Sequence, residues 1–148
     1  MRFNAAFLAD AASVREGLLH VLGGGVARVG RPLFPAPLDC VLVAQLSIPQ
    51  DELRENYQLT VTITDDEGKM ASQLGATFAH SPFPVVDLAE GEDAHIPMVL
   101  PTAGMVLPHP GLYHLTISIP EGTESDVTFY AWDLKTTAPF PGVPTLQG

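Results

Sequence analysis

The sequence predicts an all-β fold, a two-sheet antiparallel β-sandwich of about eight strands with an immunoglobulin-like or a jelly-roll topology. Three observations lead to this prediction. Two segments alternate strictly between apolar and polar residues, and turn residues separate apolar runs that recur roughly every 10 to 20 residues. No long segment has the period of a helix, which excludes a βαβ architecture. The 148 residues fit one domain whose core needs no disulfide or metal.

The clearest strands are residues 57–64 and 112–119, in which every second side chain is apolar. The acidic turn at residues 65–68 ends in glycine and leads into a return strand at 69–80, while a second hairpin leads into a strand at 127–134. We expect these two alternating rows to be core residues that face across the sandwich. Their members are Leu59, Val61, Ile63, Tyr113, Leu115 and Ile117.

Four further strands are expected, at residues 3–9, 18–29, 38–48 and 95–100. The run that ends at Ile48 is apolar on both faces, which is typical of a central or covered strand. Pro97 cannot donate to a ladder, so its strand should lie at a sheet edge. Residues 49–56 and 10–17 are expected to be short helical or other turns, the second capped by Asp10.

Composition argues against several classes of partner. The formal net charge is −10, and only seven lysines and arginines are present, scattered along the chain. Nucleic acid and anionic membranes both call for clustered positive charge, so neither is expected as a partner. Residues 1–10 are too interrupted for a secretion signal, and no apolar stretch is long enough to cross a bilayer. We therefore expect a cytoplasmic protein.

No motif of catalysis or metal binding stands out. The single cysteine, Cys40, lies in an apolar run without a neighbouring base, and the Gly-x-Ser-x-Gly elbow does not occur. The five histidines form no closely spaced pair, although residues 104–114 faintly resemble half of a cupin metal motif. We therefore expect no catalytic residue, no metal and no cofactor.

Two other patterns are expected to be structural. Residues 23–25 are three glycines, but a strand rather than a helix follows them, so we expect a bulge or a close backbone approach and no phosphate loop. The acidic residues 65–67 form a tip much shorter than a calcium loop, which favours a solvated turn.

Two stretches resemble a known family. They are Phe-Leu-Ala-Asp-Ala-Ala at residues 7–12, followed by residues 17–25, and Tyr-Gln-Leu-Thr-Val-Thr-Ile-Thr-Asp-Asp-Glu-Gly at residues 57–68. The family consists of small, uncharacterised proteins of actinobacteria and similar bacteria, known only as a domain of unknown function, and its members are all-β proteins that phages could also encode. The resemblance reaches to about Asp133 and implies no catalytic residue.

The end of the chain carries two rows of side chains that the core does not use. We expect residues 1–134 to form the sandwich and residues 135–148 to form a Pro-rich, extended arm. On the last strand, Val127, Phe129 and Ala131 face the core. The opposite row, which something must cover, consists of Tyr130, Trp132 and Leu134. The large apolar side chains of the arm repeat every three residues, as in a polyproline II helix: Phe140, Val143 and Leu146.

These features favour a non-catalytic structural or interaction module that contacts a protein, either a further copy of itself or an assembly partner. A subunit of a phage or virus-like particle is one form that such a module could take. The alternative is a small-molecule-binding sandwich or barrel, which would use the histidines with Arg28 or Arg31 around a pocket.

Overall fold

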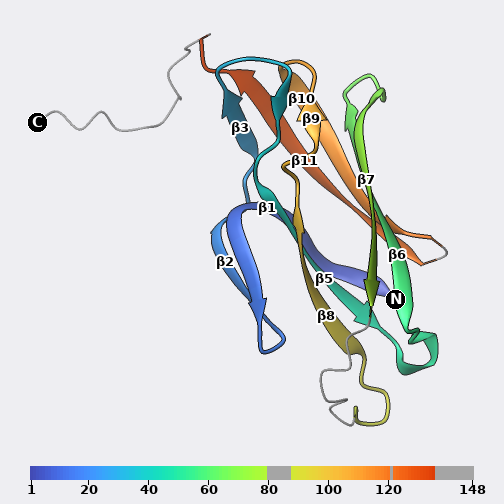
Figure 1. Ribbon diagram of the computed structural model, residues 1–148. Helices are drawn as coiled ribbons and strands as arrows, with labels where there is room; N and C mark the ends of the chain where they lie inside the picture. Colours follow the sequence, from blue (N-terminus) through green and yellow to red (C-terminus); the bar gives the residue numbers. More distant parts are fainter. Residues whose placement is uncertain (80–87, 121, 136–148) are drawn as a thin grey trace, which may run out of the picture.

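The computed structural model shows an all-β sandwich, as the sequence predicts (Figure 1). It describes residues 1–79, 88–120 and 122–135. The elements in these ranges are β1 (Arg2–Arg15), β2 (Leu18–Gly24), β3 (Arg28–Arg31), β4 (Ala36–Pro37), β5 (Val41–Ile48), the 3-10 turn η1 (Gln50–Glu52), β6 (Asn56–Asp65), β7 (Met70–Ala79), β8 (Ala94–Pro101), β9 (Val106–Leu107), β10 (Gly111–Ile119) and β11 (Thr123–Asp133).

Two sheets build the sandwich. Sheet A has the strand order β2-β1-β5-β8, and sheet B has the order β3-β11-β10-β6-β7. The short strands β4 and β9 pair with each other in a third, two-stranded sheet. Neighbouring strands are antiparallel except β3 and β11, which run parallel. The core cluster draws its side chains from both large sheets.

This strand order favours the immunoglobulin-like topology over the jelly roll. In sheet A, β1, β5 and β8 occupy the places of strands A, B and E of an immunoglobulin-like sandwich. In sheet B, β6, β10 and β11 occupy those of strands C, F and G. The chain leaves sheet A after β2 and joins sheet B as β3, beside β11. The described strands therefore follow the immunoglobulin-like plan, with β2 as an addition at one edge.

Tyr113 supports the same assignment. Its ring is fully buried near the start of β10, and its hydroxyl donates a hydrogen bond of 2.6 Å to the carbonyl oxygen of His109, four residues upstream. This arrangement is a tyrosine corner, which immunoglobulin-like sandwiches carry near the start of strand F. Leu115, two residues further on, is fully buried where antibody domains have a disulfide cysteine. Apolar packing takes the place of a disulfide at that position.

The burial of the predicted core rows is confirmed, but the two rows lie side by side in one sheet and do not face each other across the sandwich. Each of their six side chains is at most 2% exposed, and the strands that carry them, β6 and β10, are direct neighbours in sheet B. In the register, Ile63 lies opposite Leu115 and Val61 lies opposite Ile117. The two rows therefore form one continuous apolar surface that faces sheet A across the core. Sheet A contributes Leu8, Leu42, Ala44, Leu46, Ile48 and Met98.

Two predictions for the N-terminal part are wrong. Residues 10–15, expected as part of a turn, continue β1, so Asp10 caps nothing and lies instead with its carboxylate against Gly23. Residues 18–29, expected as one strand, are β2 and β3 separated by residues 25–27. The break occurs because the backbone N–H groups of Gly25 and Val26 both donate to the carbonyl oxygen of Leu8, each at 2.9 Å. The glycine run is thus a close backbone approach, as predicted, and it also ends the strand.

The described residues form eleven strands in place of the eight or so predicted: β4 and β9 were not expected, and residues 38–40 lie outside β5. The remaining strand predictions agree with the structure to within a few residues at their ends. β5 is an inner strand between β1 and β8, which explains why both of its faces are apolar. β8, which contains Pro97, is an edge strand. The segment before β6 holds a single 3-10 turn, η1. In the described ranges, no helix is long and apolar enough to cross a membrane.

Candidate functional site

The hairpin formed by β1 and β2 extends beyond the support of the sheet. β5 pairs with β1 only between Arg2 and Ala9, whereas β2 pairs with β1 from Ala9 to Arg15. Residues 10–24 therefore form a two-stranded ribbon, which Figure 1 shows in blue at one side of the sandwich. We call this ribbon the β1–β2 hairpin. Glu16 and Gly17 close it with left-handed φ angles of 52° and 75°, as a two-residue type I′ turn requires.

Apolar side chains are exposed on both faces of the β1–β2 hairpin. Leu18 and Leu22 are 64% and 72% exposed, and the alternation of the strand places both on one face. Val14 and Val21, on the other face, are 42% and 38% exposed. These four are among the ten exposed large hydrophobic residues of the described chain. β2 contains no Asp, Glu, Lys or Arg, and His20 is its only titratable residue.

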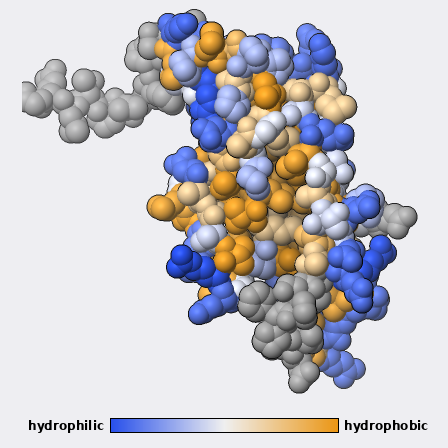
Figure 2. Space-filling model, viewed as in Figure 1, coloured by the Kyte–Doolittle hydropathy of each residue, from blue (hydrophilic) through white to orange (hydrophobic). Residues whose placement is uncertain are grey.

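The apolar surface of the hairpin continues onto the outer face of sheet A. Phe7, Val43 and Val99 are adjacent in the register of β1, β5 and β8 and lie on the face opposite the core side chains. Val43 is fully buried although it does not belong to the core cluster. Figure 2 shows hydrophobic residues gathered across the middle of the molecule, where Figure 1 shows these strands. A further layer packed on this face would meet an apolar surface.

The predicted row on β11 is present and its members lie together. Tyr130 and Leu134 are each 42% exposed, and Trp132 between them is partly buried. The guanidinium carbon of Arg28 lies 5.7 Å from the ring centroid of Tyr130 and 6.0 Å from that of Trp132, within cation–π range. Trp132 and Leu134 pack over Gly30, where a Cβ atom would lie 2.9 Å and 2.8 Å from their side chains.

The predicted apolar row of the C-terminal arm cannot be compared with the structure. Phe140, Val143 and Leu146 lie outside the described residues, which end at Lys135. The proposed boundary between the sandwich and the arm stays a prediction, although the last strand, β11, does end at Asp133.

Comparison with known protein families gives one match. A family described as a family of unknown function, DUF6941, matches residues 4–131. The chain belongs to DUF6941. The match spans the whole β1–β2 hairpin and the outer face of sheet A, but it ends before Trp132 and Leu134. A comparison with curated proteins finds no match. The bacterial or phage origin suggested by the resemblance stays a prediction.

The described histidines of this DUF6941 chain do not converge. Three of them contact three separate partners: the Nδ1 atom of His95 lies 2.8 Å from the hydroxyl of Ser47, that of His114 lies 3.3 Å from the hydroxyl of Thr128, and the Nε2 atom of His109 lies 3.6 Å from the carboxylate of Asp65. Within the described ranges, no three His, Cys, Asp or Glu side chains lie close enough to hold a metal ion. The absence of a bound metal stays a prediction.

The acidic tip between β6 and β7 differs from the expected solvated turn at one residue. Asp66 and Glu67 are exposed, but Asp65 is only 5% exposed. Its carboxylate accepts hydrogen bonds from the backbone N–H groups of Glu67 at 3.1 Å and Lys69 at 2.8 Å. A carboxylate satisfied by its own turn fixes the hairpin, which is a structural role.

Cys40 sits just before β5 and is half-buried. Burial raises the pKa of its thiol, and the hydrogen bond with Thr102 offsets this shift only in part. The hydroxyl of Thr102 also donates to the carbonyl oxygen of Cys40 at 2.6 Å, which holds the segment in place. A raised pKa keeps the thiol neutral near pH 7, and the neutral thiol is a poor nucleophile.

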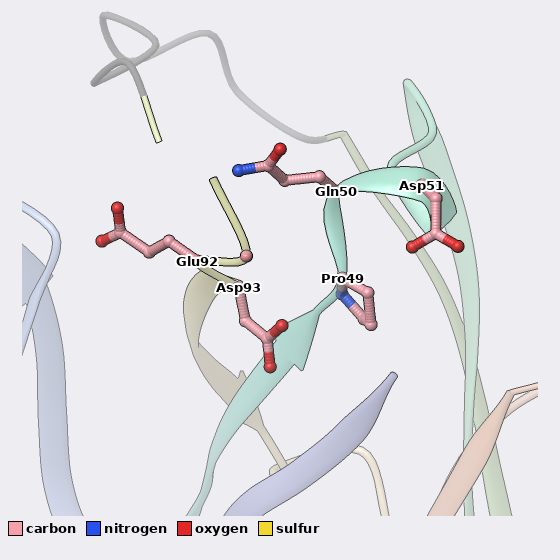
Figure 3. Close-up of a pocket in the computed structure, with 6 residues that line it drawn as sticks. Pro49, Gln50, Asp51, Glu92 and Asp93 are labelled. Carbon is pink, nitrogen blue, oxygen red and sulfur yellow. The ribbon is translucent and has the colours of Figure 1, made fainter. Parts of the chain in front are cut away.

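Two surface depressions have volumes of about 220 and 250 Å³. The first lies between η1 and the start of β8, and Figure 3 shows its residues. The carboxylate of Glu92 points away from those of Asp51 and Asp93 in that view, and the three are drawn well apart. Pockets for small molecules are usually about 300–1,000 Å³ and close around the ligand. Neither depression favours the small-molecule alternative.

Proposed function

We propose that this DUF6941 chain is a non-catalytic interaction module, a subunit of a larger protein assembly. The β1–β2 hairpin carries the proposal, because it exposes apolar side chains on both faces and has an open, uncharged edge. A two-stranded ribbon by itself is only marginally stable in water, and an uncovered apolar edge templates pairing with another chain. A partner that covers the hairpin removes both problems.

The size of the exposed apolar surface supports the same proposal. Moving Leu18 and Leu22 from their present exposure into an interface would stabilise a complex by about 1–2 kcal/mol each. On the outer face of sheet A, Phe7 and Val99 are apolar and partly exposed as well. A contiguous apolar area of this kind is typical of interaction sites.

We propose that the partner is a protein and neither nucleic acid nor a membrane. The support is the net charge of −10 with only seven basic residues, which leaves no cationic surface for phosphate groups. The setting that we propose is the cytoplasm of a bacterial host, where the assembly would be a phage or virus-like particle or a comparable complex. The support for that setting is the family resemblance.

We also propose a second docking device at the other end of the chain. In it, Phe140, Val143 and Leu146 of the arm bind the Tyr130, Trp132 and Leu134 row of the same chain or of a neighbour. The described half supports this, because Arg28 lies within cation–π range of two partly exposed aromatic rings, Tyr130 and Trp132. Exposed aromatic rings accept Pro-rich segments, whose fixed φ angles limit the entropy lost on docking.

The experiment compares the full chain with a chain that ends at Lys135. The monomer mass is 15.8 kDa. We expect the full chain to have a larger apparent mass than this in size-exclusion chromatography of a cell extract, and a larger mass in native mass spectrometry. Removal of the arm should either abolish the larger species or lower the melting temperature. It should also shift the fluorescence of Trp132, the single tryptophan, to longer wavelength, because the ring gains water contacts.

Two results would contradict these proposals separately. A full chain that runs as a monomer in the extract and after purification contradicts the assembly subunit. An unchanged mass, melting temperature and tryptophan emission after removal of the arm contradicts arm docking. Phe140→Ala in the full chain is the matched point variant, and it should reproduce part of the emission shift.

A further inference from the structure

We infer that the occupant of the β1–β2 hairpin is a second copy of this chain, which pairs its β2 antiparallel with the first across a twofold axis. This inference rests on the proposed function and names the partner of that site. The four-stranded sheet A of one copy would then join that of the other copy to form one eight-stranded sheet.

The open edge is the first step of the argument. In the described chain, β2 pairs with β1 on one side and is the last strand of sheet A on the other. Alternate residues of such a strand direct their backbone N–H and C=O groups outward. Those groups form a ready template for an added strand, and a copy of β2 supplies the matching set.

A comparison of the four sheet edges singles out β2. β8 carries Pro97 and Pro101, which interrupt any added ladder. β3 has four residues, two of them arginines. β7 is uncharged, but β9 lies against it, and the backbone N–H of Val106 donates to the Ser72 hydroxyl at 3.4 Å. β2 has no proline, Asp, Glu, Lys or Arg, and although it comes near β8, none of its residues makes a backbone hydrogen bond to the described chain beyond its pairing with β1.

Net charge opposes self-association least at the same place. Two copies with a formal charge of −10 each repel one another over most of their surface. β2 is a neutral segment of seven residues, so two copies meet there with the least repulsion between facing charges. A strongly basic partner would instead be drawn to the acidic parts of the surface, away from β2.

Strand composition fits a twofold axis through Val21. Antiparallel overlap of β2 with its copy then places Val21 opposite itself and His20 opposite Leu22, and the left-handed φ of 61° at Gly23 breaks the regular ladder toward each end. The overlap also places Leu18 and Leu19 opposite Gly24 and Gly23 of the other copy. Large side chains thus meet glycines at both ends, and the contact is self-complementary, as an isologous dimer interface requires.

The test is sedimentation velocity of the full chain over a range of concentrations. The strand pairing is a small interface, so we expect a reversible dimer with a dissociation constant on the order of micromolar. Leu22→Lys should weaken self-association by at least about tenfold, because it places two cationic side chains close together in the interface. Met70→Lys, at a residue 57% exposed on β7, changes the charge equally and should leave the dimer intact.

Folding is checked by the melting temperature of each variant at low concentration, which should match that of the parent chain. A parent chain that stays monomeric over the whole concentration range overturns the inference, and so does a dimer that Leu22→Lys leaves unchanged. If the purified chain is monomeric but elutes in a larger assembly from the cell extract, the twofold pairing is wrong and the assembly proposal stands. A monomer in both contradicts both proposals.

Discussion

Ile117→Ala will lower the free energy of unfolding by about 2–5 kcal/mol. Ile117 is fully buried in β10, opposite Val61 of β6 and within the cluster that faces sheet A. Truncation removes apolar contacts and leaves a cavity that the flanking strands cannot close without disturbing their ladders. For a chain of this size, the loss corresponds to a decrease in melting temperature of about 5–15 °C.

The matched control lies in the same strand. Leu112→Ala also removes an aliphatic side chain from β10, but Leu112 is 38% exposed on the opposite face. Urea titration of both variants measures the loss of unfolding free energy. We expect this loss to be much smaller for Leu112→Ala than for Ile117→Ala. Equal costs for the two variants, or an unchanged melting temperature for Ile117→Ala, would contradict the burial of Ile117 and with it the register of β10.

Tyr113→Phe will lower the free energy of unfolding by about 1–3 kcal/mol, although it removes a single oxygen. The phenolic hydroxyl donates to the carbonyl oxygen of His109 at 2.6 Å, and that bond ties the segment before β10 to the strand itself. The ring would keep its stacking on Phe129, with centroids 5.6 Å apart. The loss therefore isolates the hydrogen bond of the tyrosine corner from the packing of the ring.

This bond also predicts a pH dependence. Burial, as the largest cause, raises the pKa of the Tyr113 phenol in the folded chain. A raised folded-state pKa means that the stability supplied by the neutral phenol is complete below the unfolded-state pKa and is lost as the pH rises through the folded-state value. The difference between the parent chain and Tyr113→Phe should therefore shrink at strongly alkaline pH.

Urea titrations at neutral and alkaline pH measure this difference. Tyr130→Phe is the control, because Tyr130 is 42% exposed on the surface of β11. We expect its effect to stay within about 0.5 kcal/mol at either pH. A Tyr113→Phe variant as stable as the parent chain at neutral pH would contradict the tyrosine corner.

The sequence predicts the parts of the fold in which burial differs between the two faces of a strand. β6 and β10 alternate because one face meets the core and the other meets water, so period two identifies both strands and their buried rows. The row on β11 was predictable for the same reason, since Phe129 and Ala131 alternate with Tyr130 and Trp132.

The same reasoning fails at the β1–β2 hairpin because neither of its faces is buried. Ala11 and Ala12 give no contrast between faces, and Leu18 to Leu22 is apolar on both sides. The usable signal was the pair Glu16 and Gly17, which marks a two-residue turn between two runs that can pair. The parallel contact of β3 with β11 was not predictable either, since it joins segments that are distant along the chain.

Backbone hydrogen exchange along β2 tests the proposed contact surface most directly. Amides from Leu18 to Gly24 that point away from β1 have no partner strand in the described single chain, so they should exchange quickly in a dilute sample. In a concentrated sample, pairing with a second β2 should slow the exchange of those outward amides, and Leu22→Lys should abolish the slowing. Outward amides of β2 that exchange equally fast at both concentrations, in the parent chain and in the variant alike, would contradict the account.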